Sequence, residues 1–486
     1  MKTDEVIYAK VEKKAPAAAS TSTEQSLFAA RKKIFMRTVK GYFNNYRWFF
    51  VWLTQIVFYV TPWLQWNGRQ AVLYDLATQR YYMFGLVLQP SDIVYMTGLL
   101  IISALGLFLF TAIAGRLWCG YTCPQTVYTE IFMWIERKIE GDRNAQIRLE
   151  KAPMSASKAV KKITKHLAWG LFALWSGYTL VAYFTPLREL LADTVGFNLT
   201  GTELFWILFY GFMMYLFAGW MREQVCKYMC PYARFQSVMF DPDTLIVTYD
   251  AGRGESRGVR KKNVDPRSIG KGDCIDCGVC VDVCPTGIDI RNGLQMECIG
   301  CGACIDGCND IMDKMNYPRG LIRYDTENGV KDKLSRKELL RRVARGRVLI
   351  YAGILCALVA VMTYKIGSRS TFTMNIERDA RSVARTLENG DVENIYRIQL
   401  SNISEAPHAV ELSATGLNSV SVEGGGQIQL EPLSSQTIVV KLHANPAKAR
   451  GTGGTSGNNN IVLHLKPLDT TDDVIEMATV FTLPSQ

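Results

Sequence analysis

Two cysteine runs in the middle of the chain have the same spacing. Residues 274–284 read CIDCGVCVDVC and residues 298–308 read CIGCGACIDGC, so both are Cys-x2-Cys-x2-Cys-x3-Cys. Pro285 follows the first run, whereas Asn309 follows the second. Three thiolates spaced in this way surround a single centre, and a small residue such as Gly278 lets backbone amides approach the sulfur atoms. This spacing restricts the local fold more than any other feature of the sequence.

Paired runs of this kind are typical of bacterial two-cluster ferredoxins. Three cysteines of each run bind one 4Fe–4S cluster, and the fourth binds the other cluster. The first predicted cluster has as ligands Cys274, Cys277, Cys280 and Cys308. The second predicted cluster has as ligands Cys298, Cys301, Cys304 and Cys284. Zinc is the simpler alternative, but a zinc site would use two cysteine pairs separated by a wider gap.

The other cysteines are also grouped. Of 13 cysteines in the chain, only Cys356 stands alone, in an apolar segment where we expect a small buried hydrophobic residue. The remainder lie at metal-ligand spacings rather than in the scattered pattern of a disulfide-bonded secreted protein. They indicate a reducing compartment.

Apolar segments of membrane length alternate with strongly charged segments. This pattern excludes a plain soluble enzyme, although the mean hydropathy of the whole chain is only +0.03. Each span needs about 20 residues. The five predicted transmembrane helices are residues 47–66, 92–115, 166–184, 204–221 and 347–366. Because five is an odd number, the two termini are expected on opposite sides of the membrane.

Lysine and arginine residues predict the orientation. They are abundant before the first span, in the connection 116–165, and in the run KDKLSRKELLRRVARGR before the last span. The positive-inside rule makes these segments cytoplasmic, together with the region 222–346. The first thirty residues lack the apolar core of a signal peptide and are predicted to be disordered.

Two similar motifs follow apolar segments of the predicted membrane domain. They read RLWCGYTCPQT at residues 116–126 and EQVCKYMCPYA at residues 223–233. Proline disfavours helix in the residue before it, so the helices are expected to end near the second cysteine of each motif. If the chain is helical up to that point, the two cysteines of each pair lie on one face, about 5–6 Å apart at Cβ.

The repetition indicates a duplicated helix hairpin that brings four thiols to one depth. These thiols belong to Cys119, Cys123, Cys226 and Cys230. They suit a copper(I) ion or a third iron–sulfur cluster, since both select thiolate ligands. The alternative is a set of inert cysteines at helix ends.

Histidine usage excludes one kind of redox centre. Only His166 lies near a predicted span, so a haem with two histidine ligands cannot form within the bilayer. We expect His166 to be an interfacial residue, and electrons to stay on the cytoplasmic side. The sequence contains no glycine-rich phosphate-binding loop for a flavin or nicotinamide, so the electron donor is not identified.

From Thr371 onward, short runs of alternating apolar and polar residues predict β-strands. Examples are IYRIQLSNIS and QIQLEPLSSQTIVVKLHA. Their regular spacing indicates an antiparallel immunoglobulin-like sandwich, here without its disulfide. No catalytic constellation is visible in it, so we expect this domain to bind a partner.

The predicted protein is therefore multidomain, with five segments. They are a disordered cytoplasmic tail (1–34), a four-helix membrane domain with two Cys-x3-Cys-Pro motifs (35–221), a cytoplasmic two-cluster ferredoxin-like domain (222–346), a fifth transmembrane helix (347–367) and a periplasmic immunoglobulin-like domain (368–486).

Several long motifs resemble one family. They are WNGRQAVLYDL, CGYTCPQTVYTEIFMWIERKIEGDRNA, YFTPLRELLAD, REQVCKYMCPYARFQSVMFD, CIDCGVCVDVCPTGIDI and MDKMNYPRGLIRY. Over about residues 35 to 486 the chain resembles the CcoG family of cytochrome c oxidase accessory proteins, also called FixG or RdxA. The membrane cysteine pairs also resemble those of polyferredoxins of nitrate and nitrous oxide respiration.

This resemblance implies a bacterial inner-membrane protein with a cytoplasmic N-terminus and a periplasmic C-terminus. It implies assistance in assembling a high-affinity haem–copper oxidase, through reduction of Cu(II) to Cu(I). The membrane-edge cysteines would then bind or reduce copper, and the ferredoxin cysteines would supply electrons. Expected partners are the membrane, copper, oxidase assembly factors or copper chaperones, and a second copy in a homodimer, but not nucleic acid.

Two other functions compete with this one. A membrane electron-transfer subunit would pass electrons to a protein partner without copper dependence. A non-enzymatic assembly scaffold would use the external domain and keep its clusters as structural elements.

Overall fold

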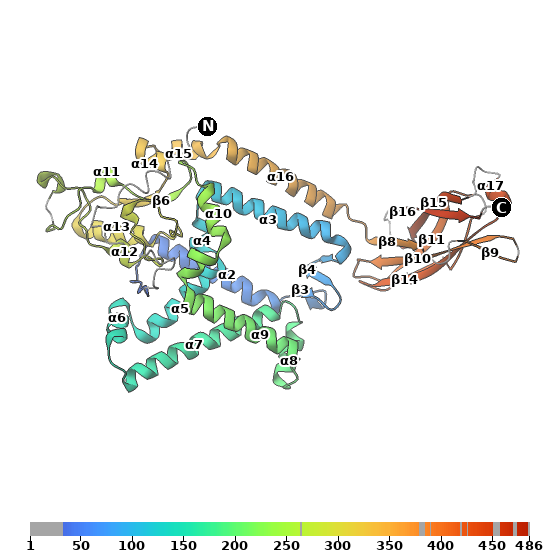
Figure 1. Ribbon diagram of the computed structural model, residues 1–486, viewed down its shortest axis with the longest axis horizontal. Helices are drawn as coiled ribbons and strands as arrows, with labels where there is room; N and C mark the ends of the chain where they lie inside the picture. Colours follow the sequence, from blue (N-terminus) through green and yellow to red (C-terminus); the bar gives the residue numbers. More distant parts are fainter. Residues whose placement is uncertain are drawn as a thin grey trace, which may run out of the picture.

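Three regions follow one another along the long axis of the molecule (Figure 1). A region of short elements and loops lies at one end, long helices occupy the middle, and a β-sandwich lies at the other end. The computed structural model describes residues 33–484, apart from 263–264, 379–383, 389, 418–419, 425, 451–456 and 470–473. The predicted tail 1–34 lies outside the described residues, except for its last two positions.

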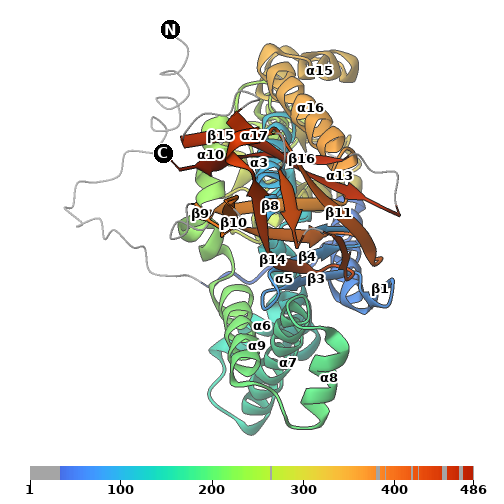
Figure 2. The same cartoon turned by 90° about the vertical axis from the view of Figure 1, so that its right-hand side faces the viewer.

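The middle region is helical. Its helices are α2 (Tyr42–Val60), η1 (Thr61–Trp63), η2 (Pro90–Asp92), α3 (Ile93–Ala114), α4 (Leu117–Tyr121), α5 (Pro124–Glu140), α6 (Arg143–Lys151), α7 (Ala156–Val181), α8 (Leu187–Val195), α9 (Gly201–Met214), the π-helices η3 (Tyr215–Met221) and η4 (Val225–Met229), α10 (Pro231–Met239) and α16 (Gly346–Gly367). Helix α7 packs along α9, and α16 packs along α3, on opposite sides of the molecule (Figures 1 and 2).

Three helices in the described part of the chain are long and apolar enough to cross a membrane. They are α3, α9 with its continuation η3, and α16. The structure therefore supports three candidate spans and not the predicted five, because the segments 47–66 and 166–184 do not form helices that are long and apolar enough.

Composition explains the two wrong spans. Helix α2 has 19 residues, but it includes two asparagines, Arg47 and Gln55, and much of its apolar character comes from aromatic rings with polar atoms. Helix α7 has 26 residues, but its first ten contain four lysines and it ends at Val181, which leaves only 16 residues of the predicted span in the helix. Both helices are therefore about as long as a membrane span of about 20 residues, but neither is apolar enough to be one.

Cys356 also differs from the expectation of a buried position. It lies in α16 and is exposed. Only 6% of the apolar window of this helix is buried within the protein. A helix that presents nearly its whole surface outward has no interior face for a cysteine to occupy.

The connection between α2 and α3 contains strands that the sequence pattern did not reveal. They are β1 (Gln65–Trp66), β2 (Arg69–Gln70), β3 (Val72–Asp75), β4 (Arg80–Met83) and β5 (Leu86–Leu88). The last three form an antiparallel sheet around the buried side chains of Leu73, Tyr82 and Val87. These strands are short, and their burial does not alternate clearly.

The ferredoxin-like region contains short elements. They are β6 (Ile246–Tyr249), α11 (Ala251–Gly254), η5 (Pro266–Ile269), α12 (Val279–Asp282), η6 (Ile290–Asn292), α13 (Ala303–Met315), β7 (Ile322–Asp325), α14 (Glu327–Asp332) and α15 (Arg336–Val343). Strand β6 pairs antiparallel with β7. Asp306 accepts hydrogen bonds from the backbone amides of Phe43 (3.3 Å) and Asn44 (2.8 Å), which attaches this region to the start of α2.

The C-terminal region is a sandwich of two antiparallel sheets. Its elements are β8 (Phe372–Arg378), β9 (Arg385–Thr386), β10 (Val392–Asn402), β11 (His408–Thr415), β12 (Ser421–Glu423), β13 (Gln427–Leu430), β14 (Ser435–Ala444), α17 (Pro446–Arg450), β15 (Gly457–Pro467) and β16 (Ile475–Leu483). One sheet has the order β12-β14-β10-β8, with β9 on β10, and the other has the order β13-β11-β15-β16. Phe372, Tyr396 and Phe481 fill the space between them. The predicted immunoglobulin-like sandwich is confirmed.

Candidate redox centre

The eight ferredoxin-type cysteines line two adjacent cavities. One cavity is lined by Cys274, Cys277, Cys280 and Cys308. The other is lined by Cys284, Cys298, Cys301 and Cys304, and Cys280 lines it as well. Apart from the shared Cys280, each cavity has three cysteines from one run and the fourth cysteine of the other run. This is the grouping predicted from the spacing, and the assignment of these thiols as cluster ligands stays a prediction.

The backbone explains how each run curves around its cavity. Gly278 and Gly302 occupy equivalent positions in the two runs and have left-handed backbone angles, with φ of 68° and 72°. Each glycine immediately precedes a helix, α12 or α13. Such angles are costly for residues with a Cβ. The helix then carries the fourth cysteine of its run toward the other cavity.

Burial changes the acidity of these thiols. It raises the pKa of Cys280 to about 11, and the pKa values of Cys298 and Cys308 to about 12. Without a metal centre these groups are therefore neutral thiols at pH 7, and coordination has to displace their protons. Thiols gathered in this way around small cavities, with apolar neighbours such as Ile290 and Met312, fit 4Fe–4S clusters, although Cys277 is exposed.

Both membrane-edge pairs lie where one helix ends and another begins. Helix α4 ends at Tyr121, and Cys123 is the N-cap of α5, with proline in the first turn. In the second pair, Cys226 lies in the π-helix η4, and Cys230 is the N-cap of α10. Helices thus end near Cys123 and Cys230 as predicted, but neither pair lies on one continuous α-helical face. The proline at N1 starts the next helix and fixes this break.

The four membrane-edge thiols occupy one neighbourhood. Cys226 interacts electrostatically with Cys119, Cys123 and Cys230, and burial raises its pKa to about 12. Burial also raises the pKa of Cys119 to about 11. The Cys119 thiol donates a hydrogen bond of 3.3 Å to the side chain of Gln236, which is fully buried.

The two motifs are not equivalent, although their sequences match. Tyr121 of the first motif is buried, whereas Tyr228 of the second is 55% exposed. Tyr121 and Tyr324 hydroxyls lie 3.2 Å apart, and Tyr324 donates to the carbonyl oxygen of Gly300. The first motif is therefore tied to the second ferredoxin run.

Gly120 lies in close contact with the second ferredoxin run. A Cβ atom at this position would lie 2.9 Å from the Ile299 carbonyl oxygen and 2.9 Å from the Cys301 Cα. Cys226 lines a cavity with Pro285, Thr286 and Ile299, so the second motif also borders the ferredoxin region. Both membrane-edge pairs thus lie beside the cavity of Cys298 and Cys301.

Arg116 was missed by sequence reasoning. Its guanidinium is buried and donates to the carbonyl oxygens of Met296 and Ala233, which joins the ferredoxin region to α10. Burial lowers the pKa of Arg116, and the nearby thiols of Cys119, Cys298 and Cys226 oppose that shift. A cation in this position favours thiolates in both cysteine regions.

Arg222 precedes the second motif as Arg116 precedes the first, but it joins η3 to α5. Its side chain donates 2.9 Å to the Gly219 carbonyl oxygen and 2.7 Å to the Glu136 carboxylate. Glu136 is also 3.3 Å from Lys165. One sequence feature could have pointed to both arginines. Each lies at the end of an apolar segment, three or four residues before the first cysteine of its motif. From the sequence, such arginines predict only the orientation of the chain in the membrane.

We predict that Glu136→Gln destabilises the protein. Burial alone would raise the pKa of Glu136, but Arg222 and Lys165 outweigh it and lower the pKa to about 2. Removing one partner from a buried ionic group costs about 3–5 kcal/mol. Thermal denaturation in detergent measures the loss. Because the pKa of Glu136 is depressed in the folded state, its ionised carboxylate stabilises the parent protein fully above about pH 4.3. This stabilisation disappears as the pH falls toward 2. The variant should lack this acid-dependent decrease, and an unchanged pH profile contradicts the prediction.

The comparison with known protein families agrees with these regions. A 4Fe-4S dicluster domain model matches residues 221–327, and a 4Fe-4S binding domain model matches residues 96–141. A model described as the IG-like fold at the C-terminal of FixG matches residues 362–484. Fold, cysteine sets and models together define an iron–sulfur protein of the ferredoxin type, with helices suited to a membrane and an immunoglobulin-like domain.

Individual relatives cover most of the chain. Protein RdxA of Cereibacter sphaeroides is 38% identical over 431 residues, covering 86% of this chain and 90% of the relative. Protein RdxB of the same organism is 39% identical over 398 residues, covering 80% and 83%. Nitrogen fixation protein FixG of Rhizobium meliloti is 35% identical over 433 residues, covering 82% of each. The chain belongs to the FixG/RdxA family, which is the family also called CcoG.

Proposed function

We propose that this protein reduces Cu(II) to Cu(I) at the membrane surface and so assists assembly of a haem–copper cytochrome c oxidase. Each Cu(II) ion takes up one electron and is released as Cu(I) to an assembly factor or copper chaperone. Cys119, Cys123, Cys226 and Cys230 are the proposed copper-binding and catalytic residues. Thiolates stabilise Cu(I) more than Cu(II), which favours the reduced product.

The contact of Gly120 with Ile299 and Cys301 carries this proposal. The residue next to Cys119 thus lies against the backbone of two residues that line the second ferredoxin cavity, which supports electron transfer from that cavity to the membrane-edge thiols. When bound, 4Fe–4S clusters supply one-electron redox centres. The eight ferredoxin cysteines would hold them, and Arg116 would stabilise negative charge on the thiolates at both sites.

A second candidate is electron transfer to a protein partner through a third cluster. Two observations favour it. The 4Fe-4S binding domain model includes Cys119 and Cys123. In addition, no three cysteine sulfurs in the described chain lie within 4.8 Å of one another, either at the membrane edge or in the ferredoxin cavities. Three or four thiolates on one ion, at a metal–sulfur distance of about 2.3 Å, would lie within about 4 Å of one another, so this spacing suits a cluster better than a copper(I) ion with three or four thiolate ligands.

A copper-reduction assay distinguishes the two candidates. The purified full-length protein is reduced, freed of excess reductant and mixed with Cu(II) and a chelator that is coloured only with Cu(I). The proposed function predicts stoichiometric colour formation and reoxidation of the protein. Reduced protein that is stable toward Cu(II), yet is oxidised by a membrane fraction, supports the electron-transfer subunit instead. No oxidation in either case supports the assembly scaffold.

Iron analysis tests the cluster assignment. We predict about eight iron atoms per chain for two 4Fe–4S clusters, and about twelve if the membrane-edge cysteines bind a third. Cys274→Ser combined with Cys277→Ser should remove about four of them, because these residues contribute half of one ligand set. Low-temperature EPR of the reduced protein identifies the remaining clusters. A colourless preparation containing zinc contradicts the assignment.

Reporter fusions test the proposed orientation. The ferredoxin-like region and the sandwich lie at opposite ends of α16 (Figure 1), which supports opposite sides of a bacterial inner membrane. We predict that a reporter after Gln486 is active only in the periplasm, and that one near Lys262 is active only in the cytoplasm. The reverse pattern would move the redox cysteines to the oxidising side.

A further inference from the structure

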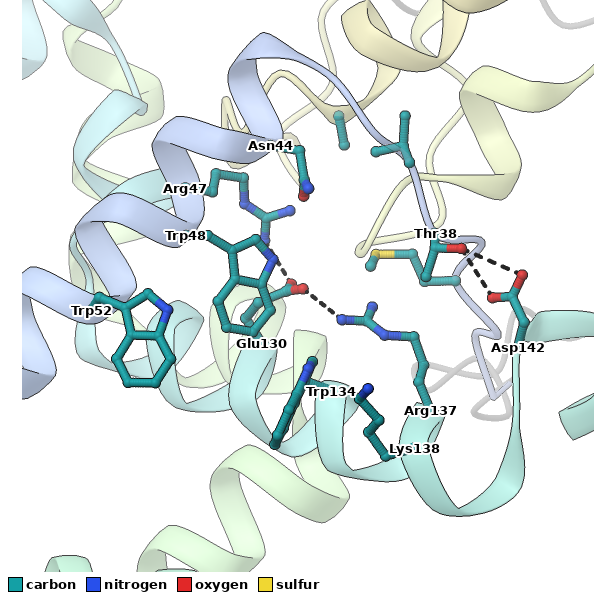
Figure 3. Close-up of a pocket in the computed structure, with 13 residues that line it drawn as sticks. Thr38, Asn44, Arg47, Trp48, Trp52, Glu130, Trp134, Arg137, Lys138 and Asp142 are labelled. Atoms are coloured by element: carbon teal, nitrogen blue, oxygen red, sulfur yellow. Dashed lines mark hydrogen bonds and ion pairs between the residues drawn. The ribbon is translucent and has the colours of Figure 1, made fainter.

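A cavity of about 530 Å³ lies between the start of α2, α5 and the first turn of α13 (Figure 3). Its size is within the range of small-molecule sites. The copper and cluster chemistry described above does not use it. Its lining nevertheless combines three tryptophans with a set of cationic and polar side chains.

Hydrogen-bond donors dominate the polar lining. Arg47 and Arg137 both bind Glu130, at 2.9 and 3.1 Å, so this buried carboxylate already has two cationic partners. Lys138 lies over the ring of Trp134 at 5.8 Å. The cavity lining has three cationic side chains and two carboxylates, those of Glu130 and Asp142. Hydrogen-bond donors are therefore in excess, while the net charge is small. A neutral ligand with oxygen acceptors fits this balance.

The aromatic residues continue into an exposed apolar strip. Trp48 and Trp134 meet edge to face at 6.5 Å, and their rings flank the cavity (Figure 3). Beyond them, one side of α2 exposes Trp52, Ile56 and Val60 at successive helical turns, with 63%, 55% and 45% of each residue exposed. A ligand with a planar head and a long apolar tail would place the head between the tryptophans and the tail along α2.

The cavity also adjoins the second ferredoxin cysteine set. Ala303 lines the cavity and lies between Cys301 and Cys304, which line the neighbouring cavity of that set. Arg47 is close enough to Cys301 for the two groups to interact electrostatically. A redox-active ligand in the cavity would therefore be one helical turn from cluster-binding residues.

We propose that this cavity binds the head group of an isoprenoid quinol and is the site of electron entry. The quinone carbonyl oxygens accept hydrogen bonds from Lys138 and Arg137. A nucleotide has no tail for the α2 strip, and an anionic phospholipid would need more net positive charge than the paired arginines leave.

The electron balance is complete with this donor. One quinol loses two electrons and two protons to become the quinone, and two Cu(II) ions become two Cu(I) ions. The protons pass to water at the open side of the cavity, where Asp142 is exposed. Glu130 does not take them, because both arginines hold it ionised. The use of the electrons rests on the proposed function, but binding of the quinone does not.

Tryptophan fluorescence tests the binding directly. Decylubiquinone is titrated into the delipidated full-length protein in detergent, and we expect saturable quenching from Trp48 and Trp134. Asn44→Phe fills the cavity from α2, and Lys138→Ala removes an exposed donor without affecting the core. We expect both variants to bind at least tenfold more weakly.

Trp63→Ala is the matched control, since this exposed tryptophan lies in η1, beyond the end of α2. It should leave the affinity unchanged. Variants count as folded if their iron content equals that of the parent.

Equal quenching in parent, Asn44→Phe and Lys138→Ala overturns the proposal. Displacement of decylubiquinone by a low concentration of short-chain phosphatidylglycerol also overturns it, because the cavity is then a lipid site. If the parent protein binds no quinone but reduces copper, this proposal fails and the proposed function stands. If it binds quinone but does not reduce copper, the proposed function fails and this proposal stands.

Discussion

Replacement of Cys119 and Cys123 by serine is expected to reduce Cu(II) reduction to the rate without protein, while about eight iron atoms remain bound. A hydroxyl group is a poor ligand for Cu(I), and two remaining thiolates would hold the ion loosely. The ferredoxin cavities should be unaffected, because they contain none of these residues. The measurements are the coloured Cu(I)–chelator assay and iron analysis on the same preparation.

Cys356→Ser is the matched control for this experiment. Cys356 is an exposed cysteine of α16, away from the clustered thiols, so its replacement should change neither copper reduction nor iron content. If the Cys119 and Cys123 variant reduces Cu(II) as fast as the parent, the copper site lies elsewhere. If it loses about four iron atoms, these cysteines hold a third cluster and serve as an electron relay.

The ferredoxin cysteine sets were predictable because their geometry is local. A fixed spacing within 11 residues determines which thiols gather, and the glycines before α12 and α13 supply the required backbone angles. The sandwich was predictable for a related reason, since alternation along β10 and β14 reflects one buried and one exposed face.

The membrane helices were only partly predictable. Length and aromatic content made α2 resemble a span, yet two of its polar residues, Arg47 and Gln55, are buried inside the protein. Arg47, for example, is buried against Glu130. A sequence window cannot distinguish a polar residue that faces lipid from one that binds a partner 83 positions away.

The contacts that connect the sites were not predictable, because they join distant segments. Arg116 binds carbonyl groups about 120 and 180 positions away, and the cavity beside Trp48 combines three segments of the chain. Arginine near a membrane end is common for topological reasons alone. Only the folded arrangement shows that this arginine lies between two cysteine regions.

Gly120→Ala is expected to uncouple the two cysteine regions without removing either. The added Cβ would lie 2.9 Å from backbone atoms of Ile299 and Cys301, closer than a Cβ contact allows, and backbone atoms cannot rotate away. The first membrane-edge motif should therefore move outward from the second ferredoxin cavity. We expect Cu(II) reduction to fall about a hundredfold, the typical cost of an ångström-scale displacement in a working site. Iron content and the EPR signals should remain those of the parent.

Gly106→Ala provides the matched control, because nothing lies within 4 Å of a Cβ added at this position of α3. It makes the same chemical change in a neighbouring helix and should leave copper reduction unchanged. Stopped-flow mixing of each reduced variant with Cu(II) separates the two outcomes. A slow Gly120→Ala variant with intact clusters supports electron delivery across the Gly120 contact. A Gly120→Ala variant as fast as Gly106→Ala would mean that electrons reach copper by another route, with Cys226, beside Pro285 and Thr286, as the next position to test.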